Sequence, residues 1–252
     1  MMKEMKQWIL AAFVIAAVPS TAQVKYTVSG LYADDGKKVY LIDQLADKAI
    51  DSIFVADGKF SFTGTADKDA LLAVKAENSK WTTEFFNDGT PVVINVNDST
   101  LKGSSLNERL AKLEVEQDIP RRILNAKTSN MTEADLMAHQ DELMDEMNKM
   151  IDEQIAFAAK VFKEERNSLI PVAFAGYYFM ENGVEAFDEL VKQQVVFANH
   201  PYLKKTRDEV EAMLKPNDSP KTAFIDRALR GKPLHRRLQK IFGESPAVAP
   251  EK

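Results

Sequence analysis

Apolar and polar residues alternate over short segments between Val24 and Gly103, and turn-forming residues separate these segments. Alternation with a period of two places every second side chain on one face of a strand, so it predicts strands that are buried on one side. Strands of this length, with turns between them, are typical of a β-sandwich or an open barrel. The expected strands are residues 26–28, 39–42, 50–55, 59–64, 70–75, 82–86 and 92–96.

Two dipeptides in this part of the chain predict tight turns. Asp57-Gly58 lies between two alternating segments, and both residue types tolerate the positive φ angles of a type I′ hairpin turn. This hairpin would place Phe60 and Phe62 on one face of the returning strand. Asp35-Gly36 is expected to form a second turn of the same kind.

After Gly103 the apolar residues recur every three or four positions, which predicts helices with one apolar face. Pro120 is expected to bend or interrupt the first helix, because proline removes a backbone hydrogen bond. Thr132 and Asp135 have the spacing of a capping box at the start of the second helix. The expected helices are residues 106–127, 132–165, 168–180, 184–199 and 201–215.

Together the two patterns predict an α+β fold. We expect an antiparallel β-sandwich-like domain at residues 23–103 and an α-helical bundle region at 104–215, since short connections favour antiparallel helices. Residues 216–252 are expected to form a proline-punctuated tail. This tail carries eight basic and four acidic groups, whereas residues 23–215 carry 23 basic and 33 acidic groups. Its basic amphipathic character predicts contact with an anionic membrane surface, an acidic partner or the acidic body of this chain.

The first 22 residues have the pattern of a secretory signal peptide. Lys3 and Lys6 precede an apolar stretch from Trp8 to Val18, and Ser20 and Ala22 supply the small residues before a cleavage site. The apolar stretch would span about 16 Å as a helix, roughly half the hydrocarbon thickness of a bilayer, so we expect no transmembrane anchor. The protein is therefore expected to be periplasmic or secreted after cleavage near Ala22.

Composition limits the chemistry. Hydrophobic residues make up 45% of the 252 residues and charged residues 28%, as in an ordinary globular protein. The chain has no cysteine, which excludes disulfides, thiolate metal sites, cysteine nucleophiles and a redox-active Cys-x-x-Cys motif. The net charge of −5 does not favour a nucleic-acid partner. We find no catalytic motif and expect no catalytic residue, cofactor or resident metal.

The segment of alternating residues resembles a known domain of unknown function. In envelope thiol-disulfide oxidoreductases of Bacteroidetes, this domain precedes a thioredoxin-like module, and a helical stretch similar to residues 106–215 leads into that module. The resemblance implies a β-rich accessory fold, export and an envelope setting. It is carried by Val28-Ser29-Gly30, Val39-Tyr40-Leu41, Ile50-Asp51-Ser52, the run from Val55 to Gly64, and the run from Lys102 to Asn107.

The chain departs from this family where the redox chemistry would lie, because only 31 residues follow Lys221 and they contain no Cys-x-x-Cys motif. Redox activity is therefore not expected. The sequence predicts an exported, non-catalytic binding or scaffolding protein of the cell envelope. Two alternatives remain: a truncated remnant of, or partner to, a thioredoxin-fold oxidoreductase, and a periplasmic protein that binds a ligand or copper.

Met144, Met147 and Met150 are the candidate copper ligands. Thioether sulfurs select Cu(I), and these residues recur every three positions within one expected helix. Three steps of 100° rotate each side chain about 60° from the previous one, so the sulfurs spread over the helix surface. Methionine is also a common filler between helices, and core packing is the favoured interpretation.

The candidate ligand-binding residues are aromatic. Aromatic side chains can stack on a sugar or a peptide, and they also fill protein cores. The segment from Ser168 to Met180 is apolar almost all round, which favours burial. The candidates are Tyr177, Tyr178, Trp81 and Phe85.

Overall fold

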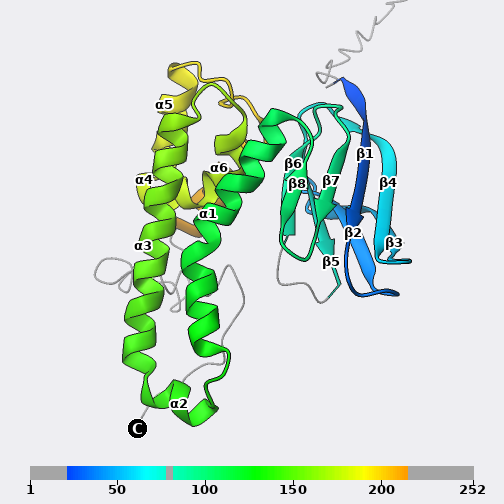
Figure 1. Ribbon diagram of the computed structural model, residues 1–252. Helices are drawn as coiled ribbons and strands as arrows, with labels where there is room; N and C mark the ends of the chain where they lie inside the picture. The colour runs from blue at the N-terminus through cyan, green and yellow to red at the C-terminus, as the bar shows by residue number, and fades with distance from the viewer. Residues whose placement is uncertain (1–21, 78–81, 215–252) are drawn as a thin grey trace, which may run out of the picture.

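The computed structural model describes residues 22–77 and 82–214. In this part of the chain, two four-stranded sheets are followed by six α-helices, so the expected α+β fold is confirmed. Figure 1 shows the sheets at one end of the molecule and the helices beside them, with two long helices extending away. The expected signal peptide and the basic tail lie outside the described residues.

The strands form two sheets that pack face to face. In the first sheet, β1 lies between β4 and β7, pairing antiparallel with β4 and parallel with β7, and β8 follows β7. The second sheet is antiparallel in the order β3-β2-β5-β6, so β6 is an edge strand. The bounds are β1 Gln23–Leu31, β2 Lys38–Asp43, β3 Lys48–Phe54, β4 Lys59–Asp67, β5 Leu71–Ala76, β6 Thr82–Phe86, β7 Val92–Asn95 and β8 Thr100–Lys102.

The residues that alternate inward fill the space between the sheets. Val28, Leu41, Phe62, Val74 and Ile94 each come from a different strand, and each is at most 2% exposed. This first core therefore follows from the period of two along each strand. Its formation confirms the expected β-sandwich.

The expected hairpin at Asp57-Gly58 is confirmed. Both residues have positive φ angles, 53° and 68°, and the flanking residues Ala56 and Lys59 exchange backbone hydrogen bonds of 3.1 and 3.0 Å. The second turn differs from the prediction, because only Gly36 of the Asp35-Gly36 pair has a positive φ, 74°. A type I′ turn needs positive φ at both central positions, so this turn belongs to another type.

The helices form a long hairpin and a compact group beside the sandwich. Helices α1 and α3 pack together, and α2 lies at the tip that connects them (Figure 1). We call residues 119–150 the arm, and none of its side chains is buried. The bounds are α1 Ser105–Thr128, α2 Glu133–Ala138, α3 Gln140–Glu164, α4 Ala175–Asn182, α5 Glu185–Lys192 and α6 Pro201–Leu214, with a 3₁₀ turn, η1, at Ile170–Phe174.

Three helix predictions need correction. Helix α1 continues through Pro120, because α3 holds it on both sides of the proline: Gln117 donates to the Gln154 carbonyl at 3.4 Å, and Lys127 forms ion pairs further along. The expected helix 132–165 is instead divided at His139, where the chain turns between α2 and α3, although its capping box is present. The third helix begins as the turn η1, and the fourth already ends at Lys192.

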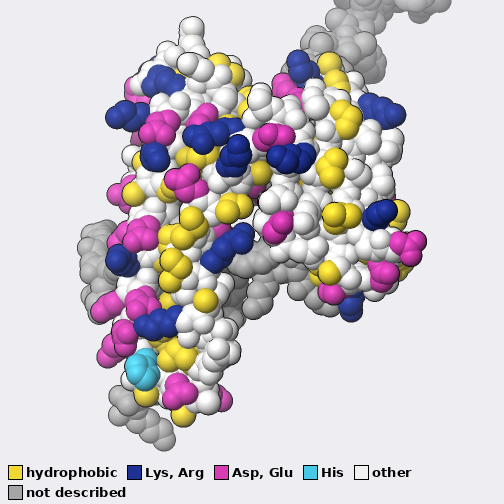
Figure 2. Space-filling view, in the orientation of Figure 1, with side chains coloured by type: hydrophobic (Ala, Val, Ile, Leu, Met, Phe, Trp, Pro, Cys, Tyr) yellow, Lys and Arg dark blue, Asp and Glu magenta, His cyan; other side chains and the backbone are white. Residues whose placement is uncertain are grey.

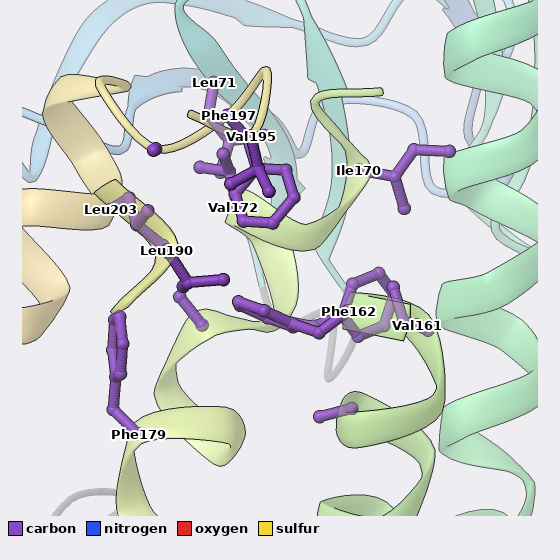
Figure 3. Packing of buried hydrophobic residues seen from close by; sticks show 14 of the residues in the cluster. Leu71, Val161, Phe162, Ile170, Val172, Phe179, Leu190, Val195, Phe197 and Leu203 are labelled. Carbon is purple, nitrogen blue, oxygen red and sulfur yellow. The ribbon is translucent and has the colours of Figure 1, made fainter. Parts of the chain in front are cut away.

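A second core joins the helices to the sandwich. Figure 3 shows Phe162, Phe179 and Leu203 converging from three helices, with Leu71 of β5 lying on the same cluster. Phe86 of β6 belongs to this cluster as well. The helices therefore cover the β5–β6 part of the outer face of the second sheet, and we call this contact the joint.

Candidate functional site

Helix α1 closes the free edge of β6 with a side chain. The Asn107 Nδ2 group donates to the Phe86 carbonyl at 2.9 Å, and its Oδ1 atom accepts from the Phe86 N–H at 2.7 Å. Asn107 is fully buried, and Ser104 caps the helix just before it. An unpaired strand edge is a template for association with other strands, so this pair of hydrogen bonds protects the edge and fixes α1 against it.

The next contact along this edge involves two carboxyl groups. Glu84 lies two residues before Phe86, so its main chain points to the same edge, and Glu114 lies seven residues after Asn107 on the same helix face. The Glu84 N–H donates to the Glu114 carboxylate. The Glu84 side chain lies on the outer sheet face together with that of Phe86. Both glutamates are half-buried.

Burial changes the acidity of both groups. It raises the pKa of Glu84 from 4.5 to about 7. For Glu114, burial and then the charge of Glu84 raise the pKa well above its usual value, while the Glu84 N–H acts in the opposite direction. Two nearby carboxyls in a poorly solvated site cannot both ionise cheaply. At neutral pH the pair therefore keeps a share of its protons.

A third carboxylate nearby is held by cations. Asp118, one helical turn after Glu114, forms ion pairs with Arg121 and with Arg122, the latter at 2.9 Å. The charge of Asp118 also raises the pKa of Glu114. Burial raises the pKa of the Tyr177 hydroxyl on α4, with opposing contributions from Arg121 and Asp118. The site thus combines a proton-holding carboxyl pair, an ion-pair cluster and a phenol.

These groups surround a cleft of about 200 Å³ between the sandwich and the helices. We call it the joint cleft. Figure 2 shows acidic and basic side chains along this boundary, whereas apolar side chains follow the front of the helical arm. The cleft is lined by Thr82, Glu84, Ser99, Glu114, Val115, Gln117, Asp118, Arg121, Arg122, Gln154, Ala173, Phe174 and Tyr177.

The other end of the joint contains a buried imidazole. His200 Nε2 donates to the Asp69 carbonyl at 2.9 Å, and His200 Nδ1 accepts from the Tyr202 N–H at 3.2 Å. Its ring meets that of Phe86 edge-on, with centroids 5.9 Å apart. Burial lowers the pKa of His200. One donating and one accepting nitrogen require the neutral ring, so His200 links α6 to the sandwich in its uncharged form.

The aromatic candidates do not form one site. Tyr177 lines the joint cleft, but Tyr178 stacks on Phe162 with ring centroids 3.7 Å apart. Phe85 is 2% exposed and belongs to the core between the sheets. Trp81 lies outside the described residues. Only Tyr177 is therefore placed at a cavity.

The methionine candidates lie on α3 in or near the arm. Met147 and Met150 pack against Ile151 and Ile155, as expected for core packing, and Met144 is half-buried. Within residues 22–77 and 82–214, no group of three or more His, Asp or Glu side chains is arranged to hold a metal ion.

Glu84 and Glu114 are not among the residues predicted from the sequence. The sequence does contain a weak signal, because each glutamate occupies a position of an otherwise apolar or buried face. Glu84 shares its strand face with Phe86, and Glu114 shares its helix face with Asn107 and Ala111. That the two carboxyls meet depends on the docking of α1 on β6.

Comparison with known families identifies the sandwich. Residues 23–110 match a family model described as a domain of unknown function, DUF4369. The sandwich is a DUF4369 domain. The match extends to Leu110, beyond the strands, and thus includes Asn107, which completes the edge of β6. No curated protein and no solved structure matches the chain. Among the helices of residues 22–77 and 82–214, none has the length and apolar character needed to cross a bilayer.

Proposed function

We propose that this chain is an exported, non-catalytic binding or scaffolding protein of the cell envelope, and that a partner contacts it at the joint cleft. The export signal and the absence of cysteine support the setting and the non-catalytic role. The DUF4369 domain supports the accessory role that the family resemblance implies. The observation that carries the proposal is the carboxyl pair of Glu84 and Glu114.

The carboxyl pair favours a partner group that donates hydrogen bonds and carries positive charge. Groups with strongly displaced pKa values in a cleft are typical of functional sites, because the fold holds them there at a cost in stability. A cation placed between Glu84 and Glu114 would compensate both charges. Phe174 and Tyr177 on the opposite wall provide apolar and aromatic surface for the stem of such a group.

The size of the joint cleft favours a side chain over a larger ligand. Cavities that hold drug-sized molecules have volumes of about 300 to 1,000 Å³, whereas the joint cleft measures about 200 Å³. We therefore infer that the occupant is a lysine or arginine side chain of an envelope protein.

The experiment is a titration of the purified chain with Nα-acetyl-lysine amide at pH 8, observed by NMR. The probe is expected to shift signals of residues that line the joint cleft, and Nα-acetyl-norleucine amide, which lacks the charge, is expected to shift them less. The double variant Glu84→Gln/Glu114→Gln should lose the response. Glu133→Gln/Glu164→Gln, which removes two exposed carboxyls, should keep it. Equal shifts with both probes, or shifts spread along the acidic arm, would refute the proposal.

A second candidate function is assistance to a separately encoded thioredoxin-fold oxidoreductase. It is favoured by the DUF4369 match together with the resemblance to domains that precede thioredoxin-like modules. A pull-down from envelope extract with the wild-type chain should enrich a thioredoxin-fold protein. A pull-down that never enriches one would count against this candidate and leave the first proposal standing.

A further inference from the structure

The joint has one end without formal charge and one end that can ionise. At the first end, Asn107 makes two hydrogen bonds to Phe86, and the neutral His200 ring packs against Phe86. At the second end, α1 is attached to β6 by the hydrogen bond from the Glu84 N–H to the Glu114 carboxylate. Only the second end contains two acidic groups that approach each other from opposite sides of the joint.

Protonation decides whether this end attracts or repels. While the pair keeps one proton, a neutral carboxyl lies beside a carboxylate, and the Glu84 N–H still has its acceptor. When both groups are ionised, two like charges face each other in a site with little water. Both then gain hydration if α1 moves away from β6.

The surrounding charges do not remove this repulsion. Asp118 adds a third negative group on α1 and is itself paired with Arg121 and Arg122. From α6, Tyr202 is close enough that the charge of Glu84 contributes to raising its pKa. The other titratable groups around the pair are Tyr177 on α4, Lys205 and Glu209 on α6, and Asp47 in the turn between β2 and β3.

We propose that protons control the width of the joint cleft: it is closed while the Glu84–Glu114 pair keeps a proton, and it opens when both carboxyls are ionised. The uncharged end, with Asn107, Phe86 and the second core, stays in contact and acts as the pivot. The arm then swings relative to the DUF4369 domain. This inference concerns the cleft used by the proposed function, but it requires no ligand, so either can fail without the other.

The absence of cysteine makes a direct distance measurement possible. Cysteines introduced at two exposed positions, Thr63 on β4 and Asn125 on α1, would carry the only nitroxide labels of the chain. Double electron-electron resonance at pH 5 and pH 8 would then report the distance between the DUF4369 domain and the arm. We expect one narrow distribution at pH 5 and a longer or broader one at pH 8, with an open population that increases at least about tenfold.

Variants decide whether the carboxyl pair is responsible. In Glu84→Gln/Glu114→Gln, the distribution at pH 8 should remain that of pH 5, and the single variant Glu114→Gln should behave in the same way. The exposed control Glu164→Gln should open like the wild type. As a second measurement, hydrogen exchange of the Glu84 amide, corrected for its intrinsic pH dependence, should accelerate at pH 8 in the wild type alone. Identical wild-type distributions at both pH values, or opening of the double variant, would overturn the inference.

Discussion

Replacement of Glu84 by glutamine should stabilise the protein at neutral and alkaline pH. The pKa of Glu84 rises from 4.5 to about 7 on folding, so between these values the folded state binds more protons than the unfolded state. The contribution of this group to the free energy of unfolding therefore falls as the pH rises through this window. One pH unit corresponds to about 1.4 kcal/mol, so the complete loss amounts to about 3 kcal/mol.

Glutamine keeps the size of the side chain and removes its charge. We expect Glu84→Gln to exceed the wild type in unfolding free energy by about 1 to 3 kcal/mol at pH 8 and by less than about 1 kcal/mol at pH 5. The upper value is a limit, because Glu84 is only half-buried and Glu114 can take up the shared proton in its place.

Urea unfolding at pH 5 and pH 8, followed by circular dichroism, measures both values. Glu164→Gln removes an exposed carboxyl from the end of α3 and should change the stability by less than about 0.5 kcal/mol at either pH. A destabilised Glu84→Gln variant, or an advantage over the wild type that is the same at pH 5 and pH 8, would refute the reasoning.

Two further predictions concern the uncharged end of the joint. Asn107→Ala leaves both main-chain groups of Phe86 without their partner and should cost about 2 to 4 kcal/mol in urea unfolding, whereas the exposed Asn125→Ala should cost less than about 0.5 kcal/mol. His200 has a lowered pKa, so the unfolded state binds its proton more readily, and its contribution to stability is present above pH 6.5 and lost as the pH falls. His200→Ala should therefore cost about 2 kcal/mol at pH 7.5 and clearly less at pH 5, and a cost independent of pH would contradict the neutral role of the ring.

The elements that form within a few residues were predictable. The turn at Asp57-Gly58 needs only two residues that accept positive φ, and the cap at Thr132 needs only a hydroxyl and a carboxylate three residues later. Periodicity placed Phe62 in the first core because side chains alternate along every strand. Where such local rules failed, a neighbouring helix decided: α1 passes through Pro120 while it is held by α3.

The candidate site was not predictable in the same way. Glu84 and Glu114 are separated by thirty positions, and each looks like an ordinary surface glutamate until α1 lies along β6. Tyr177 was selected for its aromatic character, and its position at the joint cleft follows from the docking of α4.

The sequence by itself determined the order of strands and helices, the main turn and cap, and the side chains that must avoid water, because these follow from backbone geometry and from the period of apolar residues. The tertiary structure alone decided that β1 pairs in parallel with β7, that Asn107 completes the edge of β6, and that two carboxyls share one poorly hydrated space. Such contacts join distant segments, and they form only when the burial of apolar faces outweighs the chain entropy lost in bringing those segments together.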